Sequence, residues 1–193
     1  MDYIVYRTLK FICKPIFWLL FHPTVEGFEN IPKTGGVILA GNHTSSWDAI
    51  FMLYAPKRIV HMMAKKELFN NKFKNWFFRS MACISVDRSV HDKNAKNEAI
   101  DIVKNGNILG IFPEGTTNKT KEIILPFKYG AVSIANKAEA YIVPFSITGK
   151  YSKRNIKITY GKPYKVSDDL EKENKKLENN VIKLLKENKR WKT

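Results

Sequence analysis

A histidine and an aspartate five residues apart could together form a general base. They are His43 and Asp48, in the turn after the apolar segment 36–40, which is typical of a buried strand. Ser45 and Asp48 resemble a capping box, which predicts that a helix begins at Ser45 or Ser46. A carboxylate that bonds one ring nitrogen leaves the other nitrogen free to accept a proton. The alternative is that Asp48 serves only as a helix cap.

Two further predicted strands also end in polar residues. Asp87 and Arg88 follow one apolar run, and Glu114 and Gly115 follow another. Open α/β sheets bind their ligands beyond the carboxyl ends of their strands. We therefore expect these residues to converge with His43 at one edge of a sheet.

Apolar runs of strand length alternate with amphipathic stretches of helix length along most of the chain. This alternation predicts an α/β fold with a mixed, largely parallel sheet flanked by helices. Pro144 suggests a sheet end or an irregularity, and the last strand looks like an edge strand. The expected strands are 36–40, 59–64, 82–86, 108–112, 141–147 and 155–160, with a short strand and turn within 25–32. The expected helices are one from Ser45 or Ser46 to 54, then 65–78, 92–105, 127–140 and 167–189.

Residues 1–24 are expected to form an N-terminal amphipathic helix that ends at His22-Pro23, followed by the main domain over residues 25–193. Aromatic side chains interleaved with Lys10 and Lys14 suit a membrane interface. The alternative is a helix packed on the domain. The apolar stretch is far shorter than the roughly 20 residues that span a bilayer, and the N-terminus lacks the features of a signal peptide.

The charge balance implies a polyanionic partner. Lys and Arg number 33 against 18 Asp and Glu, a net charge of +15, which suits nucleic acid, anionic lipid or an acidic carrier. No nucleic-acid-binding signature is present, so nucleic acid is the remote alternative. Cys13 and Cys83 are too few for a disulfide framework, which indicates a reducing cytoplasm. His22, His61 and His91 lack metal-ligand spacing, so no metal is expected.

Four segments in order resemble the motifs of the glycerophospholipid acyltransferase family, over about residues 25–165. All four together are specific, although each alone is modest. Two intervening segments, 65–68 and 128–131, also resemble the family. The four segments are Asn42-His43-Thr44-Ser45-Ser46-Trp47-Asp48, Ile84-Ser85-Val86-Asp87-Arg88, Phe112-Pro113-Glu114-Gly115-Thr116 and Ile142-Val143-Pro144-Phe145.

The resemblance implies transfer of an acyl group from a thioester, on acyl carrier protein or coenzyme A, to a hydroxyl of a glycerol phosphate. The expected acceptor is 1-acylglycerol-3-phosphate (lysophosphatidic acid), and the product is phosphatidic acid. By the same resemblance His43 is the general base and Asp48 orients it. No covalent acyl-enzyme is implied, and the chain has no Gly-x-Ser-x-Gly nucleophile elbow. No cofactor is expected beyond the thioester co-substrate.

The resemblance also implies which residues bind the acceptor. Arg88 suits its phosphate, the alternative being a surface salt bridge with Asp87. Lys65 is a second candidate, with Lys66 equally available. Glu114 is expected to fix its loop or to bond the glycerol.

The remaining candidate binding residues shape the site. Gly115 lets the backbone approach a ligand closely, Thr116 belongs to the same motif, and Pro144 is expected to form the floor of the site.

One position departs from the family pattern. Thr117 stands where the family usually has an arginine, and Lys119 or Lys121 could replace that charge. The departure leaves other acceptors open: glycerol 3-phosphate, another lysophospholipid or an aminoacyl lipid.

Clustered cations suit an anionic membrane surface and an acidic carrier protein. Residues 57–79 hold seven cations and one acid, and residues 150–193 hold fourteen and six. We therefore expect a peripheral or monotopic protein on the cytoplasmic face of the cell membrane.

Overall fold

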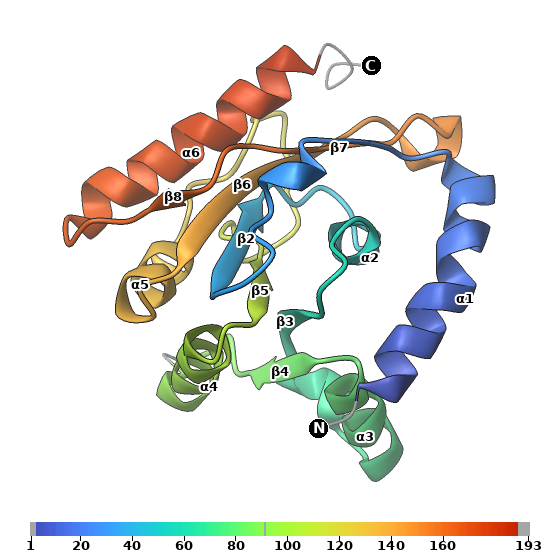
Figure 1. Ribbon diagram of the computed structural model, residues 1–193, viewed down its shortest axis with the longest axis horizontal. Coiled ribbons are helices and arrows are strands. Elements are labelled where there is room, and N and C mark those ends of the chain that lie inside the picture. The colour runs from blue at the N-terminus through green and yellow to red at the C-terminus, as the bar shows by residue number, and fades with distance from the viewer. Residues whose placement is uncertain (1–2, 91, 189–193) are drawn as a thin grey trace.

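A computed structural model of the protein describes residues 3–90 and 92–188. Within them eight strands form one sheet in the order β1-β7-β6-β2-β5-β3-β4, with β8 also paired to β6 (Figure 1). The strands are β1 (Thr24–Glu26), β2 (Val37–Gly41), β3 (Val60–Lys65), β4 (Cys83–Val86), β5 (Ile108–Ile111), β6 (Tyr141–Thr148), β7 (Lys157–Tyr160) and β8 (Tyr164–Lys165).

The sheet is mixed and largely parallel, which confirms the predicted fold class. β6, β2, β5, β3 and β4 run parallel to one another. β7 and β8 pair antiparallel with β6, and β1 runs parallel to β7. The parallel arrangement brings the carboxyl ends of β2, β4 and β5, and the residues that follow them, to one edge.

Helices cover both faces of the sheet. α4, α5 and α6 lie on one face, and α1 and α2 lie on the other, as Figure 1 shows. α3 lies at the end of the sheet, beside β4. The helices are α1 (Ile4–Phe21), α2 (Asp48–Tyr54), α3 (Lys72–Ser80), α4 (Lys93–Lys104), α5 (Gly130–Lys137) and α6 (Leu170–Glu187), with short 3₁₀ turns η1 (Phe28–Asn30), η2 (Lys66–Phe69) and η3 (Tyr151–Lys153).

β2 lies in the middle of the sheet and is buried along its whole length. Ile38 and Ala40 face the core under α4, α5 and α6, whereas Val37 and Leu39 face the core under α2. A strand covered on both faces needs a continuous apolar sequence, which explains why this segment is apolar at every position. Its burial fixes the start of the turn that carries His43.

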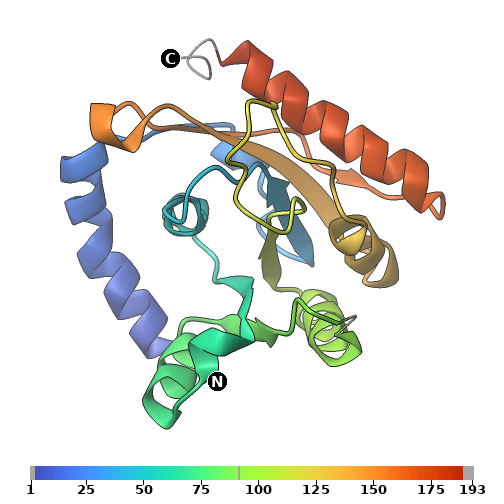
Figure 2. The same cartoon turned by 180° about the vertical axis from the view of Figure 1, so that it is seen from behind.

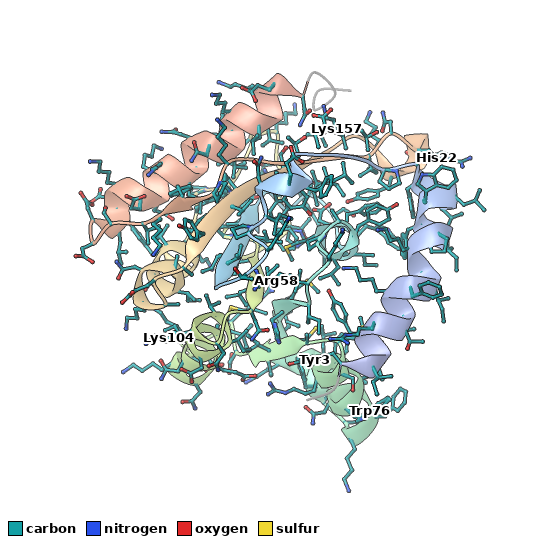
Figure 3. All side chains as sticks on the ribbon, viewed as in Figure 1. Tyr3, His22, Arg58, Trp76, Lys104 and Lys157 are labelled. Atoms are coloured by element: carbon teal, nitrogen blue, oxygen red, sulfur yellow. The ribbon has the colours of Figure 1, made fainter. Side chains whose placement is uncertain are left out.

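α1 packs against the domain along one side. Tyr6 is buried and its hydroxyl accepts the Val60 amide at 3.3 Å, while the Tyr3 hydroxyl lies 2.9 Å from Nε2 of His61. Figure 3 shows Tyr3 and His22 at the two ends of this helix. Near its C-terminal end, aromatic rings meet at centroid distances of 5.4–6.1 Å: Phe17 and Phe21 against Trp47 and Phe51.

The outer side of α1 is apolar and exposed, so the helix has two apolar sides. The predicted helix and its end at His22 agree with the structure, and the division of the chain at residue 24 stays a prediction. Among the described residues no helix has the length and apolar character needed to cross a bilayer. The exposed apolar side chains of α1 are Ile4, Phe11, Ile12, Ile16, Trp18, Leu19 and Leu20.

The expectation of an edge position for the strand near residues 155–160 was wrong. β7 is flanked by β6 and by β1, whose residues Thr24–Glu26 pair with residues 157–159. The short strand expected within residues 25–32 is β1, but three residues are too short a run to predict its pairing with β7. Pro144 lies inside β6, where the antiparallel neighbour changes from β8 to β7, and the predicted irregularity is this change.

Two predicted helices have different limits because side chains interrupt them. The stretch 65–78 divides into η2 and α3, since the Asn71 side chain accepts the Lys74 amide at 2.8 Å and starts a new helix. The helix expected from residue 127 begins only at Gly130. The Phe127 amide is bonded by Glu178 of α6, which holds this residue in the preceding loop (Figure 2, yellow segment). Lys189, the last residue of the predicted C-terminal helix, lies outside the described residues.

Candidate active site

The turn after β2 holds His43 against a fully buried carboxylate. Nδ1 of His43 lies 3.1 Å from Oδ2 of Asp48, and the Asp48 side chain is 0% exposed. The same oxygen accepts the amides of Thr44 at 2.6 Å and Ser45 at 2.7 Å. Two backbone amides and the imidazole nitrogen converge on one oxygen of a buried carboxylate, and these contacts fix the carboxylate in place.

The expected helix start at Ser45 or Ser46 was two to three residues too early. α2 begins at Asp48, because the Asp48 amide closes a tight turn onto the Ser45 carbonyl at 3.0 Å. One half of the predicted capping box is present, namely the Ser45 amide bonded to the Asp48 carboxylate. The tight turn therefore points the aspartate back toward the histidine.

The loop after β5 holds the imidazole from the other side. The Phe112 ring stacks on the His43 ring with a centroid distance of 4.2 Å and an interplanar angle of 14°. The His43 carbonyl accepts the Asn118 amide at 2.7 Å, and Nε2 lies 3.4 Å from the Thr117 hydroxyl. The imidazole side chain is 16% exposed, so the ring is oriented without being sealed off.

Glu114 joins the two loops. Its carboxylate accepts the His43 amide at 2.7 Å and the Leu125 amide at 2.8 Å. Burial raises the pKa of Glu114, and the two amide donors act in the opposite direction. Because both carboxylate oxygens are engaged by the backbone, the contacts favour a role in fixing the loop.

Arg88 and Gly115 are brought together at the same edge. Nη1 of Arg88 donates to the Gly115 carbonyl at 3.1 Å, and Arg88 is exposed. Asp87 is instead bonded by Lys66 and Ser89, which lower its pKa to about 2. The contacts of Asp87 thus leave the Arg88 guanidinium directed at the loop and not at its neighbour.

Lys128 also lies beside Gly115. The glycine has φ +72°, and a Cβ there would lie 2.9 Å from Nζ of Lys128. A side chain at this position would collide with the lysine and strain the backbone. The Lys128 amide donates to the Pro113 carbonyl at 2.9 Å, which fixes the lysine beside the loop. Two cations, Arg88 and Lys128, therefore lie beside one glycine.

The remaining predicted binding residues are Lys65, Thr116 and Pro144. Lys65 is exposed at the end of β3, and Thr116 is exposed in the loop after β5. Pro144 is buried in the sheet, opposite Ala40, where its ring lies beside Gly161. The structure joins His43, Asp48 and Glu114 by hydrogen bonds, and it joins Arg88 to Gly115. It places Pro144 within the sheet.

Three residues of the site were not predicted from the sequence. Phe112 lies in the third motif, but its position in the sequence does not indicate that its ring stacks on the histidine. Lys128 stands in a segment that resembles the family without an assigned role. Tyr151, whose hydroxyl bonds Oδ1 of Asp48, lies in a loop with no motif at all. These contacts depend on how distant segments fold together.

A histidine whose Nδ1 faces a buried carboxylate can take up a proton at Nε2. A pair of this kind, at the carboxyl edge of a largely parallel sheet, has the chemistry needed to activate a hydroxyl or a water. Within residues 3–90 and 92–188 no three His, Cys, Asp or Glu side chains come together as metal ligands.

Comparisons with known proteins identify the class. Residues 22–148 match the family profile described as Acyltransferase. The chain is 36% identical over 149 residues to the 1-acyl-sn-glycerol-3-phosphate acyltransferase of Bacillus subtilis, covering 72% of each protein. It is 34% identical over 136 residues to the protein of that name from Borreliella burgdorferi, covering 68% of this chain and 54% of that one.

A solved structure agrees with this match. The crystal structure of the 1-acyl-sn-glycerophosphate (LPA) acyltransferase from Thermotoga maritima superposes with a TM-score of 0.80 and 28% identity, covering 97% of this chain and 81% of that one. The chain belongs to the acyltransferase family, which confirms the resemblance seen in its four motifs. It is an O-acyltransferase of phospholipid biosynthesis.

Proposed function

We propose that this chain transfers a fatty acyl group from a thioester to the sn-2 hydroxyl of 1-acylglycerol-3-phosphate, giving phosphatidic acid. The observation that carries the proposal is the contact of His43 with the buried Asp48, 3.1 Å apart. Glu114, which bonds the His43 amide, directly precedes Gly115, whose carbonyl is bonded by Arg88. The base and a cationic side chain thus contact the same short loop after β5. The names of the relatives from Bacillus subtilis and Borreliella burgdorferi support this acceptor.

In this reaction His43 acts as general base and then as general acid. Nε2 takes the proton of the acceptor hydroxyl as its oxygen attacks the thioester carbonyl carbon. Asp48 accepts the Nδ1–H bond and stabilises the imidazolium. The carbon–sulfur bond then breaks, and Nε2 returns the proton to the leaving thiolate. Such assistance contributes about 10²–10⁴-fold to the rate.

The acceptor phosphate binds between Arg88 and Lys128. Both side chains lie close to Gly115, so both can reach an anion that lies over the glycine backbone. An arginine offers a bidentate pair and a lysine a point charge. Thr117 stands at the usual arginine position, and Lys128 supplies the positive charge that is missing there. The Thr117 hydroxyl lies beside Nε2 of His43.

Of the neighbouring Lys65 and Lys66, Lys65 is the better additional ligand for the phosphate, after Arg88 and Lys128. Lys66 is paired with Asp87, whereas Lys65 is exposed at the end of β3. We assign Thr116 and Pro144 only supporting roles, Thr116 in the loop after β5 and Pro144 within the sheet.

The acyl donor is a thioester of acyl carrier protein or coenzyme A. The net charge of +15 supports attraction of either, because the carrier protein is acidic and coenzyme A carries phosphates. The acidic surface of the carrier protein is complementary to the lysines dispersed over α6 and its surroundings. We favour the carrier protein on this ground.

The enzyme works as a peripheral or monotopic protein on the cytoplasmic face of the membrane. The exposed apolar side of α1 continues onto α3, where Phe73 and Trp76 are exposed. The two helices are in contact, and Trp76 projects on the side of α1 in Figure 3. Apolar rings beside Arg7 and Lys74 suit an anionic interface. The headgroup can then reach the site while the acyl chain stays in the bilayer.

Mass spectrometry of lipid products tests the proposal. The purified protein is incubated with lysophosphatidic acid and a mixture of acyl-carrier-protein and coenzyme A thioesters, with His43→Ala as control. We expect phosphatidic acid from the wild type and a loss of about 10²–10⁴-fold in the variant. Retained turnover in the variant would remove His43 as base.

The acceptor is tested in the same assay because Thr117 departs from the family pattern. Glycerol 3-phosphate, a lysophospholipid without a phosphate monoester and an aminoacyl lipid are supplied in turn. Faster turnover of an acceptor that lacks a phosphate monoester would reject the proposed role of Arg88.

A further inference from the structure

Each oxygen of the Asp48 carboxylate has its own donors. Oδ2 bonds Nδ1 of His43 and the Thr44 and Ser45 amides. Oδ1 is bonded by the hydroxyl of Tyr151, a residue 103 positions further along the chain. Because the Asp48 side chain is fully buried, an oxygen without a donor would carry a desolvation cost. The Tyr151 hydroxyl prevents that cost.

The tyrosine is held in place by its surroundings. Its ring packs on Phe51 of α2 at a centroid distance of 5.4 Å and meets Phe21 of α1 edge-on at 6.0 Å. Burial and the nearby Asp48 carboxylate raise the pKa of Tyr151, so its hydroxyl stays protonated and acts as donor.

The backbone around Tyr151 is also fixed. The Lys150 amide is bonded by Oδ1 of Asn155 at 2.7 Å, which closes the loop containing η3. Arg154 of the same loop bonds the Leu19 carbonyl and lies 2.9 Å from Nδ1 of His22, at the end of α1. The donor is therefore presented from a fixed loop and not from a free side chain.

We propose that Tyr151 is a positioning residue for the His43–Asp48 pair. Its hydroxyl holds Oδ1 so that the carboxylate plane cannot rotate and Oδ2 stays directed at Nδ1 of His43. That orientation keeps the ring proton on Nδ1 and leaves Nε2 ready for the acceptor hydroxyl. The inference deepens the proposed function and depends on its assignment of His43 as the base. A loss of geometry in such a pair lowers the rate of the chemical step without weakening substrate binding.

Tyr151→Phe tests this role because it keeps the ring and its packing on Phe21 and Phe51. We expect kcat to fall by about 10–100-fold, the usual cost of removing the partner of a residue that orients a reacting group. The KM values for both substrates should stay unchanged. The acid limb of the kcat–pH profile should move to higher pH, because a carboxylate that has lost a donor holds the imidazolium more strongly. Glu114, the other nearby carboxyl, keeps both of its amide donors in the variant.

Tyr160→Phe is the matched control. It also removes a buried hydroxyl whose bond goes to α2, namely to the Met52 carbonyl at 3.5 Å, and not to Asp48. It should leave kcat and the pH profile unchanged. Wild-type kcat and pH profile in Tyr151→Phe would overturn the proposal, and so would a rise in KM without a change in kcat or an equal loss in Tyr160→Phe.

The assay keeps this inference separate from the identity of the acceptor. Thiol release from the donor is followed with whichever acceptor the wild type uses fastest. If that acceptor is not lysophosphatidic acid, the proposed acceptor is wrong, and the comparison of Tyr151→Phe with Tyr160→Phe still decides the role of the tyrosine. If His43→Ala remains active, the assignment of the base fails and the inference about Tyr151 fails with it.

Discussion

The carboxylate of Glu114 accepts a hydrogen bond from the backbone amide of His43 at 2.7 Å. This contact joins a loop that follows β5 to a turn that follows β2, so two segments 71 residues apart share one support. The second oxygen of Glu114 holds the Leu125 amide, further along the same loop. The position of the imidazole therefore depends on a carboxylate that need not touch substrate.

Glu114→Gln should lower both stability and turnover. A glutamine offers one acceptor oxygen, so either the His43 or the Leu125 amide faces an NH₂ group and stays unpaired. Such a loss costs about 1–3 kcal/mol, measured as a lower urea midpoint at unchanged slope. Glu122→Gln, an exposed carboxylate in the same loop, serves as the control. Equal midpoints and equal kcat for the two variants would show that the backbone bonds of Glu114 are unimportant.

Arg88→Ala and Lys128→Met should each raise the acceptor KM with little effect on the donor KM. A hydrogen bond to a charged group is worth about 1.5–3 kcal/mol, which corresponds to roughly a 10–150-fold change. Lys119→Met and Lys121→Met remove exposed cations of the same loop and should leave the acceptor KM unchanged. If these controls raise KM and Lys128→Met does not, the phosphate binds further along the loop.

Polar substitutions on the outer side of α1 should release the protein from anionic vesicles. Phe11 and Leu19 are 82% and 61% exposed, so their replacement by serine does not disturb the core. Full burial of such a side chain is worth about 1.5–3 kcal/mol, so with both side chains half-buried in the interface the double variant should lose about tenfold or more in partitioning. Sedimentation with vesicles measures this. Tyr141→Ser, which changes an exposed ring at the start of β6, is the control. Unchanged sedimentation of the double variant would place the membrane contact elsewhere.

Acid should loosen the attachment of α1 at its first turn. The Tyr3 hydroxyl lies 2.9 Å from Nε2 of His61, and burial lowers the pKa of His61 below its ordinary value of 6.5. A lowered pKa means that the folded state binds fewer protons than the unfolded state. Stability is therefore complete above pH 6.5 and falls as the pH drops below that value toward the folded pKa.

Urea unfolding of the wild type and His61→Gln between pH 7.5 and pH 5 measures the change in the free energy of unfolding. Each unit of difference between the folded and unfolded pKa corresponds to about 1.4 kcal/mol. The wild type should lose more stability than the variant over this interval. Parallel curves for the two proteins would contradict the assignment.

Local patterns predicted much of the fold and part of the site. His43 and Asp48 lie within one turn, so their spacing alone suggested the contact, and β2 is apolar throughout because both of its faces are covered. The start of α5 could not be predicted, because it depends on Glu178 of α6, 51 residues away from the amide it bonds. The role of Tyr151 is equally non-local, since only the packing of α1 and α2 brings its hydroxyl to Asp48.

The contact between α1 and α3 has a geometric consequence for a protein that rests on a flat lipid layer. A rod lying on a plane leaves the attached body free to roll about the rod's long axis. On the proposed membrane side, the exposed rings of Phe73 and Trp76 on α3 would add a support away from that axis and oppose rolling, leaving only spinning about the layer normal. The entrance to the proposed site would then keep a constant height above the lipid, and a laterally diffusing substrate would meet it in the same pose.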